Sequence, residues 1–224
     1  MHLLDRPVWA TLTTHHANLS EGNELARRFL PDVNLFASAC DDSAVSIAAL
    51  ASLIKSPVYF LQVPDIVAPP GLVEVKAGTC VQMVAAQNRA IEVRRDDMVT
   101  LTDEDAPEML SLARLTEPGP FMPRTHTMGT FLGVRIDGRL AAMAGERMRF
   151  PGYTEVSAVC THPDFRGRGL ARRLSAAVMT DIVARGERPF LHAWKTNYAA
   201  ISLYENLGFT IRADVNVLVM KPRD

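Results

Sequence analysis

The segment from residue 154 to residue 171 constrains the fold most, because it joins a strand to a helix through two glycines. Residues 154–161 are rich in Val and Thr and predict a strand, which must end at Pro163 because proline has no N–H for the ladder. The helix that follows is indicated by apolar residues at a spacing of four, namely Leu170, Leu174, Val178 and Ile182. The chain therefore needs a fold in which a glycine-containing loop opens directly into a helix.

This junction predicts an anion site. The first-turn N–H groups of a helix have no intrahelical acceptor, and the helix dipole adds partial positive charge there. Gly167 and Gly169 lack a Cβ that would block close approach of a ligand to the backbone. A phosphate or pyrophosphate suits such a site, and Arg166, Arg168, Arg172 and Arg173 add charge around it. A tight turn followed by a solvated helix face is the alternative.

Composition excludes several classes of function. The chain has 224 residues, 48% of them hydrophobic, which allows one large domain or two small ones. Its net charge of −1 gives no support for a nucleic-acid partner. Three separate cysteines without a CxxC pair indicate neither a disulfide framework nor a zinc site, so we expect no metal. With no signal-peptide pattern and no membrane-length apolar run, we expect a soluble, cytoplasmic protein.

The first third of the chain predicts a small α/β unit, which we bound at residues 1–95. Strands are expected at 8–14, 33–39, 57–63, 72–75 and 80–85, and helices at 21–29 and 42–54. The unit has no Arg/Gly turn of the kind seen at 166–169 and is expected to be non-catalytic. His15 and His16 are expected to form a surface pair, because no acidic or Cys partner stands at metal-binding spacing.

A second unit, residues 97–224, follows the charged residues 94–97. Strands are expected at 98–101, 129–136, 139–150, 154–161, 190–194, 209–213 and 215–220, and helices at 102–115, 170–182 and 197–206. Asp137-Gly138 predicts a type I′ hairpin turn. The Pro/Gly loop 116–123 is typical of a binding element within a domain.

Two segments of the second unit resemble the GNAT superfamily of N-acyltransferases. Arg166-Gly167-Arg168-Gly169-Leu170-Ala171 matches the acyl-CoA loop of that family, Q/R-x-x-G-x-G/A. Residues 197–209, NYAAISLYENLGF, match its N-x-x-A-x-x-L-Y-x-x-L-G-F signature. The resemblance covers about residues 97–221 and implies a mixed α/β (α+β) fold with a mostly antiparallel sheet flanked by helices. It implies that residues 1–95 are a degenerate half-copy, as in the branch with glycine N-acyltransferase-like proteins.

The resemblance implies acetyl-CoA, or another acyl-CoA, as the co-substrate. Its pyrophosphate would lie on the first-turn N–H groups, and its pantetheine arm between strands 154–161 and 190–194 as an added strand. The implied cofactor-binding residues are Val159, Cys160, Thr161, Arg166, Gly167, Arg168, Gly169, Leu170, Ala171, Arg172, Asn197 and Tyr204. Cys160 is expected to be a buried small apolar residue rather than a nucleophile.

Four residues are candidates for the chemistry. Tyr204 holds the position of the family's general acid. A phenol stays protonated at neutral pH, so it can donate a proton. The alternative is that Tyr204 only packs its helix onto the sheet. Glu155 and Glu146 are candidate bases for the acceptor ammonium, with His192 as a weaker option. Glu155 is expected to share a strand face with Ser157 and Val159, and an exposed strand-end role is its alternative.

These residues predict an N-acetyltransferase that moves an acetyl (acyl) group to a primary amine by direct attack. The alternative is a non-catalytic acyl-CoA sensor or scaffold. A P-loop that binds a nucleotide phosphate is disfavoured, because no Lys-Ser/Thr follows the glycines. We expect a small-molecule or peptide amine as acceptor, no nucleic acid or membrane partner, and a monomer or homodimer. The sequence leaves the acceptor and the acyl chain open.

Overall fold

The computed structural model describes residues 2–86 and 92–223. Its strands are β1 (Ser20–Gly22), β2 (Ala26–Phe29), β3 (Ala37–Ala39), β4 (Val58–Gln62), β5 (Leu72–Ala85), β6 (Met98–Leu101), β7 (Phe131–Ile136), β8 (Arg139–Phe150), β9 (Tyr153–Thr161), β10 (Arg188–Trp194) and β11 (Phe209–Pro222). Its α-helices are α1 (Pro7–Leu12), α2 (Ala44–Leu53), α3 (Ala106–Thr116), α4 (Leu170–Ala184) and α5 (Tyr198–Asn206). Within the described residues, no helix has the length and apolar content needed to cross a bilayer.

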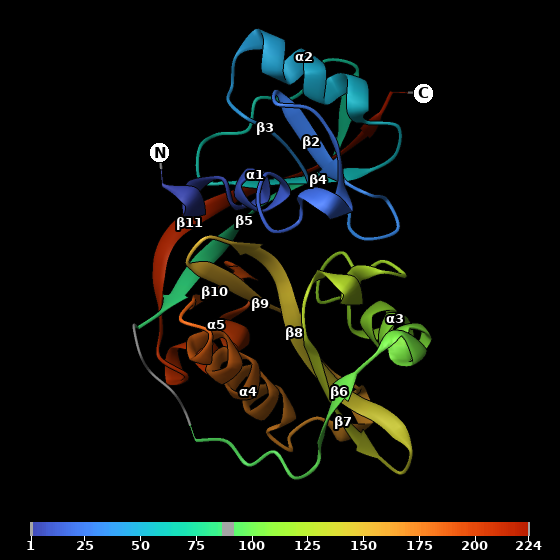
Figure 1. Cartoon of the computed structure of the whole chain (residues 1–224), viewed down its shortest axis with the longest axis vertical. Helices are drawn as coiled ribbons and strands as arrows, with labels where there is room; N and C mark the ends of the chain where they lie inside the picture. The colour runs from blue at the N-terminus through green and yellow to red at the C-terminus, as the bar shows by residue number, and fades with distance from the viewer. Residues whose placement is uncertain (1, 87–91, 224) are drawn as a thin grey trace.

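One large mixed sheet organises the molecule (Figure 1). It has eight strands in the order β4-β11-β5-β10-β9-β8-β7-β6, and β1, β2 and β3 form a separate small sheet. In the large sheet β9 and β10 are parallel, and the other neighbours are antiparallel. The expected fold, a mostly antiparallel sheet flanked by helices, is therefore confirmed.

Helices cover both faces of this sheet. Leu174 and Val178 of α4 are buried against one face, together with Ala144 of β8. Met109 of α3 is buried against the other face, together with Met143 of β8. Because successive strand residues point to opposite faces, the neighbours Met143 and Ala144 separate the two cores. α1 lies on the face that α3 covers, further along the sheet, where it packs on β8 in a third cluster.

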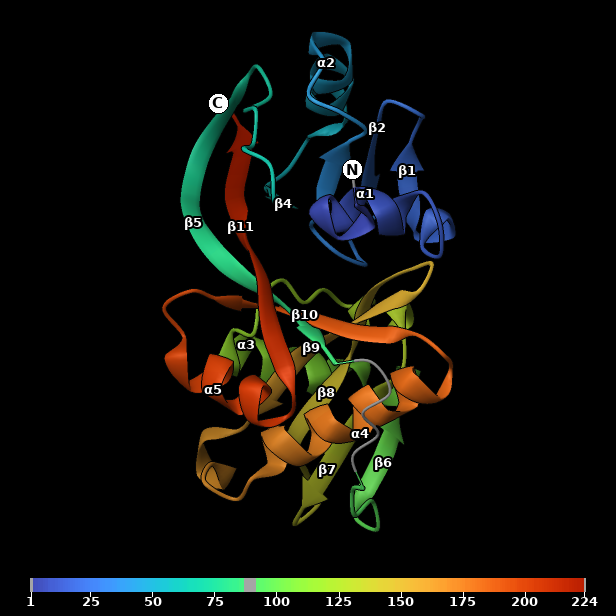
Figure 2. The ribbon, with the colours of Figure 1, turned by 90° about the vertical axis from the view of Figure 1, so that its left-hand side faces the viewer.

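The two longest strands come from opposite sides of the boundary that we expected near residue 95, and they pair with each other. β5 lies between β10 and β11 in the sheet, and it pairs with β11 from Ala85↔Phe209 to Leu72↔Pro222. Figure 2 shows these two strands running side by side into the part of the molecule that contains α2. Each was expected as two shorter strands. Register shifts in the pairing, such as that between Ile211 and Ala213, explain the irregular pattern within one strand.

Two expectations for the first third are wrong. Residues 8–14 were expected to form a strand, but Pro7 starts helix α1 and buries Val8 and Leu12, four residues apart, on one side. Residues 21–29 were expected to form a helix, but they contribute to strands β1 and β2. Gly22 has a φ of +124°, and the Asn23 side chain accepts hydrogen bonds from the N–H groups of Leu25 and Ala26. These turn contacts override helix propensity.

Candidate active site

The loop before α4 leaves the start of this helix open. Gly169 is the N-cap residue at φ +71°, Gly167 lies at φ +77°, and no side chain caps the helix. A Cβ built on either glycine would meet no atom within 4 Å, so glycine is required here by the left-handed backbone conformation and not by crowding. The first-turn N–H groups of this fifteen-residue helix therefore have no side-chain cap, and the space beside the two glycines that precede them is open.

The arginines around this loop have different surroundings. Arg166 and Arg172 are exposed, and the Arg168 guanidinium lies 5.4 Å from the centroid of the Phe165 ring. Arg173 is held in an ion pair with Asp97, so it contributes less to the mouth of the loop than expected. Three of the four predicted cations thus remain available near the start of α4.

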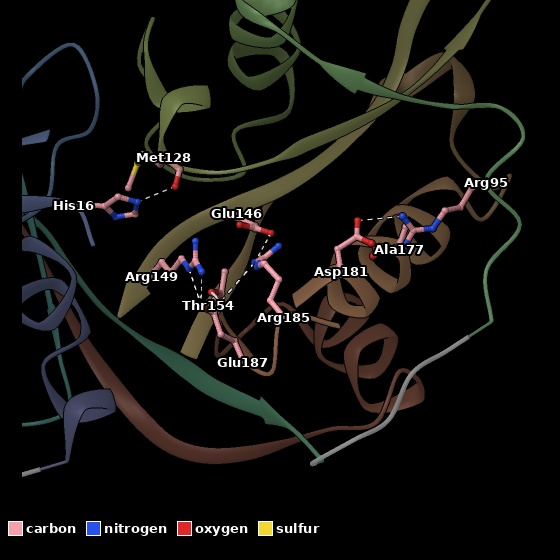
Figure 3. Close-up of polar contacts among 10 residues, drawn as sticks. All are labelled: His16, Arg95, Met128, Glu146, Arg149, Thr154, Ala177, Asp181, Arg185 and Glu187. Carbon is pink, nitrogen blue, oxygen red and sulfur yellow. Dashed lines mark hydrogen bonds and ion pairs between the residues drawn. The ribbon is translucent and has the colours of Figure 1, made fainter. Parts of the chain in front are cut away.

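The charged residues 94–97 are attached to α4. The Arg95 Nη2 donates to Asp181 at 2.8 Å and to the carbonyl of Ala177 at 2.8 Å (Figure 3). With the pair between Arg173 and Asp97, these contacts tie the segment expected to be a break to the helix behind the sheet.

Strands β9 and β10 separate beside this loop. Their parallel pairing is limited to three positions, from Tyr153↔Arg188 to Glu155↔Phe190. Beyond it the facing edges of the two strands are unpaired with each other. The divergence that the resemblance implied between these strands is therefore present in the chain.

A β-bulge in β9 changes which side chains share a face. Ala158 has a φ of +50°, and the register with β8 shifts between Ser157 and Cys160. Val159 consequently packs on the α4 side of the sheet, whereas Glu155 faces Arg147 on the other side. The expectation that Glu155 and Val159 share one face is wrong, because the bulge interrupts the alternation on which it depended.

A cavity of about 650 Å³ lies between the diverging strands. β9, β10, α5 and the loop after α3 line it, and the loop residues 117–121 were expected as a binding element. Residues of the first third also line the cavity, among them Phe36, Tyr59, Lys76 and Cys80. Sequence reasoning missed this contribution, because nothing local in those residues signals a site.

Tyr204 of α5 and Asn197, the residue just before this helix, line the cavity. Burial raises the pKa of Tyr204 to about 12, so its hydroxyl keeps its proton well above neutral pH. The Tyr204 ring also packs edge-on against Phe209, with 6.0 Å between ring centroids. Asn197 caps α5, since its side chain accepts from the N–H of Ala200 at 3.1 Å.

The two cysteines near the site are thiols rather than thiolates. Burial raises the pKa of both Cys160 and Cys80 to about 12. The Cys160 thiol donates to the carbonyl of Ala158 at 3.2 Å. Both groups therefore behave as small buried residues.

Glu155 is the centre of a buried ionic cluster. Its side chain is 0% exposed and accepts two hydrogen bonds from Arg147, at 2.7 and 2.8 Å. The Nδ1 of His192 lies 2.7 Å from the same carboxylate. Burial alone would raise the pKa of Glu155, but Arg147 and His192 together lower it to about 2. Glu155 is therefore a fully ionised, fully engaged carboxylate.

Further hydrogen bonds fix the orientation of His192. The Gln82 Oε1 accepts from Arg212 at 2.9 Å, and its Nε2 donates to the carbonyl of Leu4 at 2.8 Å. The same Nε2 lies 3.1 Å from the Nε2 of His192, which must therefore accept. The proton of a neutral His192 is then on Nδ1, directed at Glu155. Five strands, from β11 to β8, contribute a side chain to this chain of contacts.

Glu146 lies in a different cluster, on the other side of the sheet from Arg147. Its carboxylate accepts from Arg185 at 2.8 Å, just after the end of α4. Arg185 also approaches Glu187, which pairs with Arg149 and accepts from Thr154 (Figure 3). Glu146 is not among the residues that line the cavity. These contacts hold the end of α4 against the sheet.

His16 is not on the surface. It is 5% exposed, and its Nε2 lies 2.8 Å from the carbonyl of Met128 (Figure 3). Burial lowers the pKa of His16 to about 4, so the ring is neutral at pH 7. The expected surface pair is therefore wrong for His16 and confirmed for His15, which is exposed. The long-range contact with Met128 has no local signal in the sequence.

The ionic cluster predicts a large loss of stability when Glu155 is made neutral. We expect Glu155→Gln to lower the free energy of unfolding by roughly 3–5 kcal/mol, because Arg147 is left as an uncompensated buried cation. Glu146→Gln is the matched control and should cost less, because its partner Arg185 is 31% exposed and can be hydrated. Urea unfolding at pH 7 measures both. Equal losses would contradict this account.

The same cluster predicts an acid dependence of stability. The folded pKa of Glu155, about 2, lies below the ordinary value of 4.5. Its contribution to stability is therefore present above about pH 4.5 and is lost as the pH falls toward 2. In Glu155→Gln this part of the pH dependence should be missing.

Known proteins with similar sequences and structures indicate one family. A model of the FR47-like protein family matches residues 131–219. The crystal structure of a protein from Novosphingobium aromaticivorans, named as an acetyltransferase of the GNAT family, has a TM-score of 0.93 and 41% identity over 100% of both chains. A GCN5-related N-acetyltransferase from Kribbella flavida shares the fold, with a TM-score of 0.64 and 16% identity over 100% of this chain and 97% of its own.

A mycothiol acetyltransferase from Nocardiopsis dassonvillei is 33% identical in an alignment of 106 residues that covers 43% of this chain. The chain matches only 32% of the length of that curated relative. The FR47-like match includes the loop before α4 and the whole of α5, where the two sequence motifs lie. Given the end-to-end likeness to the Novosphingobium protein at 41% identity, the chain belongs to the GNAT family of acetyltransferases.

Proposed function

We propose that this protein transfers an acetyl group from acetyl-CoA to the primary amine of a small-molecule or peptide acceptor by direct attack. One observation carries the proposal. A cavity of about 650 Å³ lies where β9 and β10 diverge, and Tyr204, His192 and Arg147 all line it. A thioester and an amine could meet there beside groups that give and take protons.

The residues around α4 and β9 fit acetyl-CoA. The open first-turn N–H groups from Arg168 to Ala171 would receive its pyrophosphate, with Arg166 and Arg172 nearby. The edge of β9 that is free of β10, including Val159, Cys160 and Thr161, offers backbone groups to the pantetheine amides. When bound, acetyl-CoA supplies the activated acetyl group as a thioester.

The protein's own residues would manage the protons. As the new C–N bond forms and the C–S bond breaks, Tyr204 donates its proton to the departing sulfur, and the proton that the new amide nitrogen releases restores Tyr204 through solvent. The acceptor ammonium must first lose a proton, which we assign to Nε2 of His192. This nitrogen accepts from the Gln82 amide in the structure, so that amide must turn away as the proton arrives, while Nδ1 keeps its contact with Glu155. Because Glu155 is buried and strongly acidic, its role is to orient His192 and balance its charge, with His192 nearer the acceptor. Glu146 has less support as a base, since it lies among Arg185 and Glu187.

A sensor or scaffold that binds acyl-CoA without turnover is the competing function. The two are separated by incubating the full chain with acetyl-CoA and a panel of primary amines, and measuring released CoA with a thiol reagent. Amine-dependent release supports the proposed transfer. Binding of acetyl-CoA without release for any amine would favour the sensor.

The proposed cofactor site predicts a loss of binding in Gly169→Asp. In the wild type, acetyl-CoA at a hundredfold excess over its Kd should raise the melting temperature by roughly 5–10 °C. Gly169→Asp should remove this rise, because it places an anion and a Cβ where the pyrophosphate would lie. Gly186→Asp is the matched control, with φ +78° and open space at the other end of α4. A rise of wild-type size in Gly169→Asp would exclude the loop as the site.

We also propose that residues 1–95 contain no second cofactor site and correspond to a degenerate half of a two-domain branch. The support is a β3-α2-β4 unit with a parallel bridge between Phe36 and Tyr59, which has an α/β rhythm but no open glycine loop before α2. Calorimetry should give one acetyl-CoA per chain. We further propose a cytoplasmic monomer or homodimer, and the free state of Cys40, Cys80 and Cys160 is compatible with a reducing setting.

A further inference from the structure

Arg147 presents one unused nitrogen to the cavity. Its Nε and Nη2 bind the two oxygens of Glu155. For Nη1, the contacts of the described residues include no hydrogen bond, although the Arg147 side chain is only 10% exposed. A Cβ built on Gly119 would lie 3.7 Å from Nη1, so the loop after α3 passes this nitrogen without a side chain to cover it.

The guanidinium of Arg147 is held rigidly in this position. The bidentate contact with Glu155 fixes its plane, and its Cζ lies 4.9 Å from the centroid of the Phe36 ring, which forms part of the cavity wall. A guanidinium held on two sides loses little freedom when a third group binds. Nη1 is therefore a preorganised donor, of the kind that binds a carboxylate.

The charges around the cavity favour an anion. The charge of Glu155 balances that of Arg147. Apart from His192, the other charged side chains of the lining therefore decide the sign of the net charge around the cavity. These are Lys76 and Arg114, which outnumber Glu117. All three are exposed at the rim, where their effect is screened, while Nη1 supplies the specific contact inside.

We infer that the acceptor is a small amine that also carries a carboxylate, with the carboxylate on Nη1 of Arg147 and the amine beside His192. The inference rests on the proposed acetyl transfer. Arg147 and His192 contact the same Glu155 carboxylate, so the two subsites are neighbours. An acceptor that spans them has its amine and carboxylate only a few bonds apart, as in an α- or β-amino acid. On this inference, polyamines and other polycations are expected to be poor acceptors.

The test uses the full chain, acetyl-CoA and matched pairs of acceptors that differ only in the carboxylate. The pairs are glycine and glycinamide, alanine and alaninamide, and β-alanine and its amide, compared by kcat/KM for CoA release. We expect each acid to be preferred by tenfold or more, as for a hydrogen bond to a charged group. The amides have the less basic amine, so kcat/KM is expressed per neutral amine. Amides used as well as their acids would overturn the inference and leave the proposed function intact.

Variants assign the preference to Arg147. Arg147→Lys keeps a cation for Glu155 but cannot bind the carboxylates of Glu155 and of the acceptor at the same time. The ratio of kcat/KM for the acid to kcat/KM for the amide should therefore fall about tenfold or more. Arg114→Gln, at the rim of the same cavity, should change the ratio less than threefold because its charge is screened. An unchanged ratio in Arg147→Lys would overturn the assignment. The wild-type comparison stands even if this variant does not fold.

Binding without turnover separates the two possible failures. The protein saturated with free CoA is titrated with each acid and amide by calorimetry. If no acceptor releases CoA but the acids bind and the amides do not, the proposed transfer fails and the carboxylate site stands. If neither acids nor amides bind or react, the inference is overturned.

Discussion

Replacing Tyr204 with phenylalanine should lower the turnover number about a hundredfold or more, with little change in the affinity for acetyl-CoA. The phenylalanine keeps the ring contact with Phe209 and removes only the proton donor. Because burial raises the pKa of Tyr204 to about 12, the wild type should lose no rate through ionisation of this group near pH 10, where an ordinary phenol titrates.

Single-turnover measurements of CoA release test this prediction, since they isolate the chemical step. Tyr198→Phe is the matched control, because Tyr198 starts the same helix and is 76% exposed. An unchanged single-turnover rate in Tyr204→Phe would mean that Tyr204 only packs α5 onto the sheet. A loss of rate with an equal loss of acetyl-CoA affinity would also contradict a role as acid.

A chain that starts at Glu92 is expected not to fold. Such a chain lacks β4 and β5, which are the strands that pair with β11. β11 would keep no partner strand, and β10 would keep only its short pairing with β9. Apolar residues of β11 and β10, such as Phe209 and Phe190, would be exposed. We expect an insoluble product, or a soluble one without cooperative thermal unfolding.

The control is a chain that starts at Pro57, which keeps β4 and β5 and loses the small sheet, α1 and α2. It should retain the large sheet but be less soluble. Removing residues such as Leu4 and Ile47 exposes the apolar residues of the large sheet that pack against them. Circular dichroism and the melting shift with acetyl-CoA distinguish the two chains. If the chain from Glu92 folds and binds acetyl-CoA with the wild-type shift, residues 97–224 are an independent domain, as the sequence alone predicts.

The sequence predicted the fold of the second part of the chain closely. The Asp137-Gly138 turn joins β7 to β8 with φ values of 50° and 77°, as a type I′ turn requires. α4 starts after Gly169, and Asn197 caps α5. In each case the interacting atoms lie within a few residues of one another, so the signal is local.

The first third was predicted less well, because its apolar patterns suit more than one element. Val8 and Leu12 lie on one side of a helix, yet the short run that contains them also resembles a strand. Only packing against β8 and the small sheet decides between the two. For residues 21–29, the turn at Gly22 and Asn23 competes with helix propensity and wins.

By itself the sequence determined the glycine loop at the start of α4, the position of Tyr204 on α5 and the strand that carries Glu155. These depend on backbone geometry and periodicity over a few residues. The tertiary structure alone decided that Glu155 binds Arg147 and His192, that Glu146 lies on the opposite side of the sheet, and that residues from the first third line the cavity. Strand pairing brings these groups together across long stretches of chain, and a bulge at Ala158 sets which side chains face the site. No short segment of the sequence predicts this strand pairing or this bulge, because the register of a sheet is set by the strands that pair and not by one strand alone.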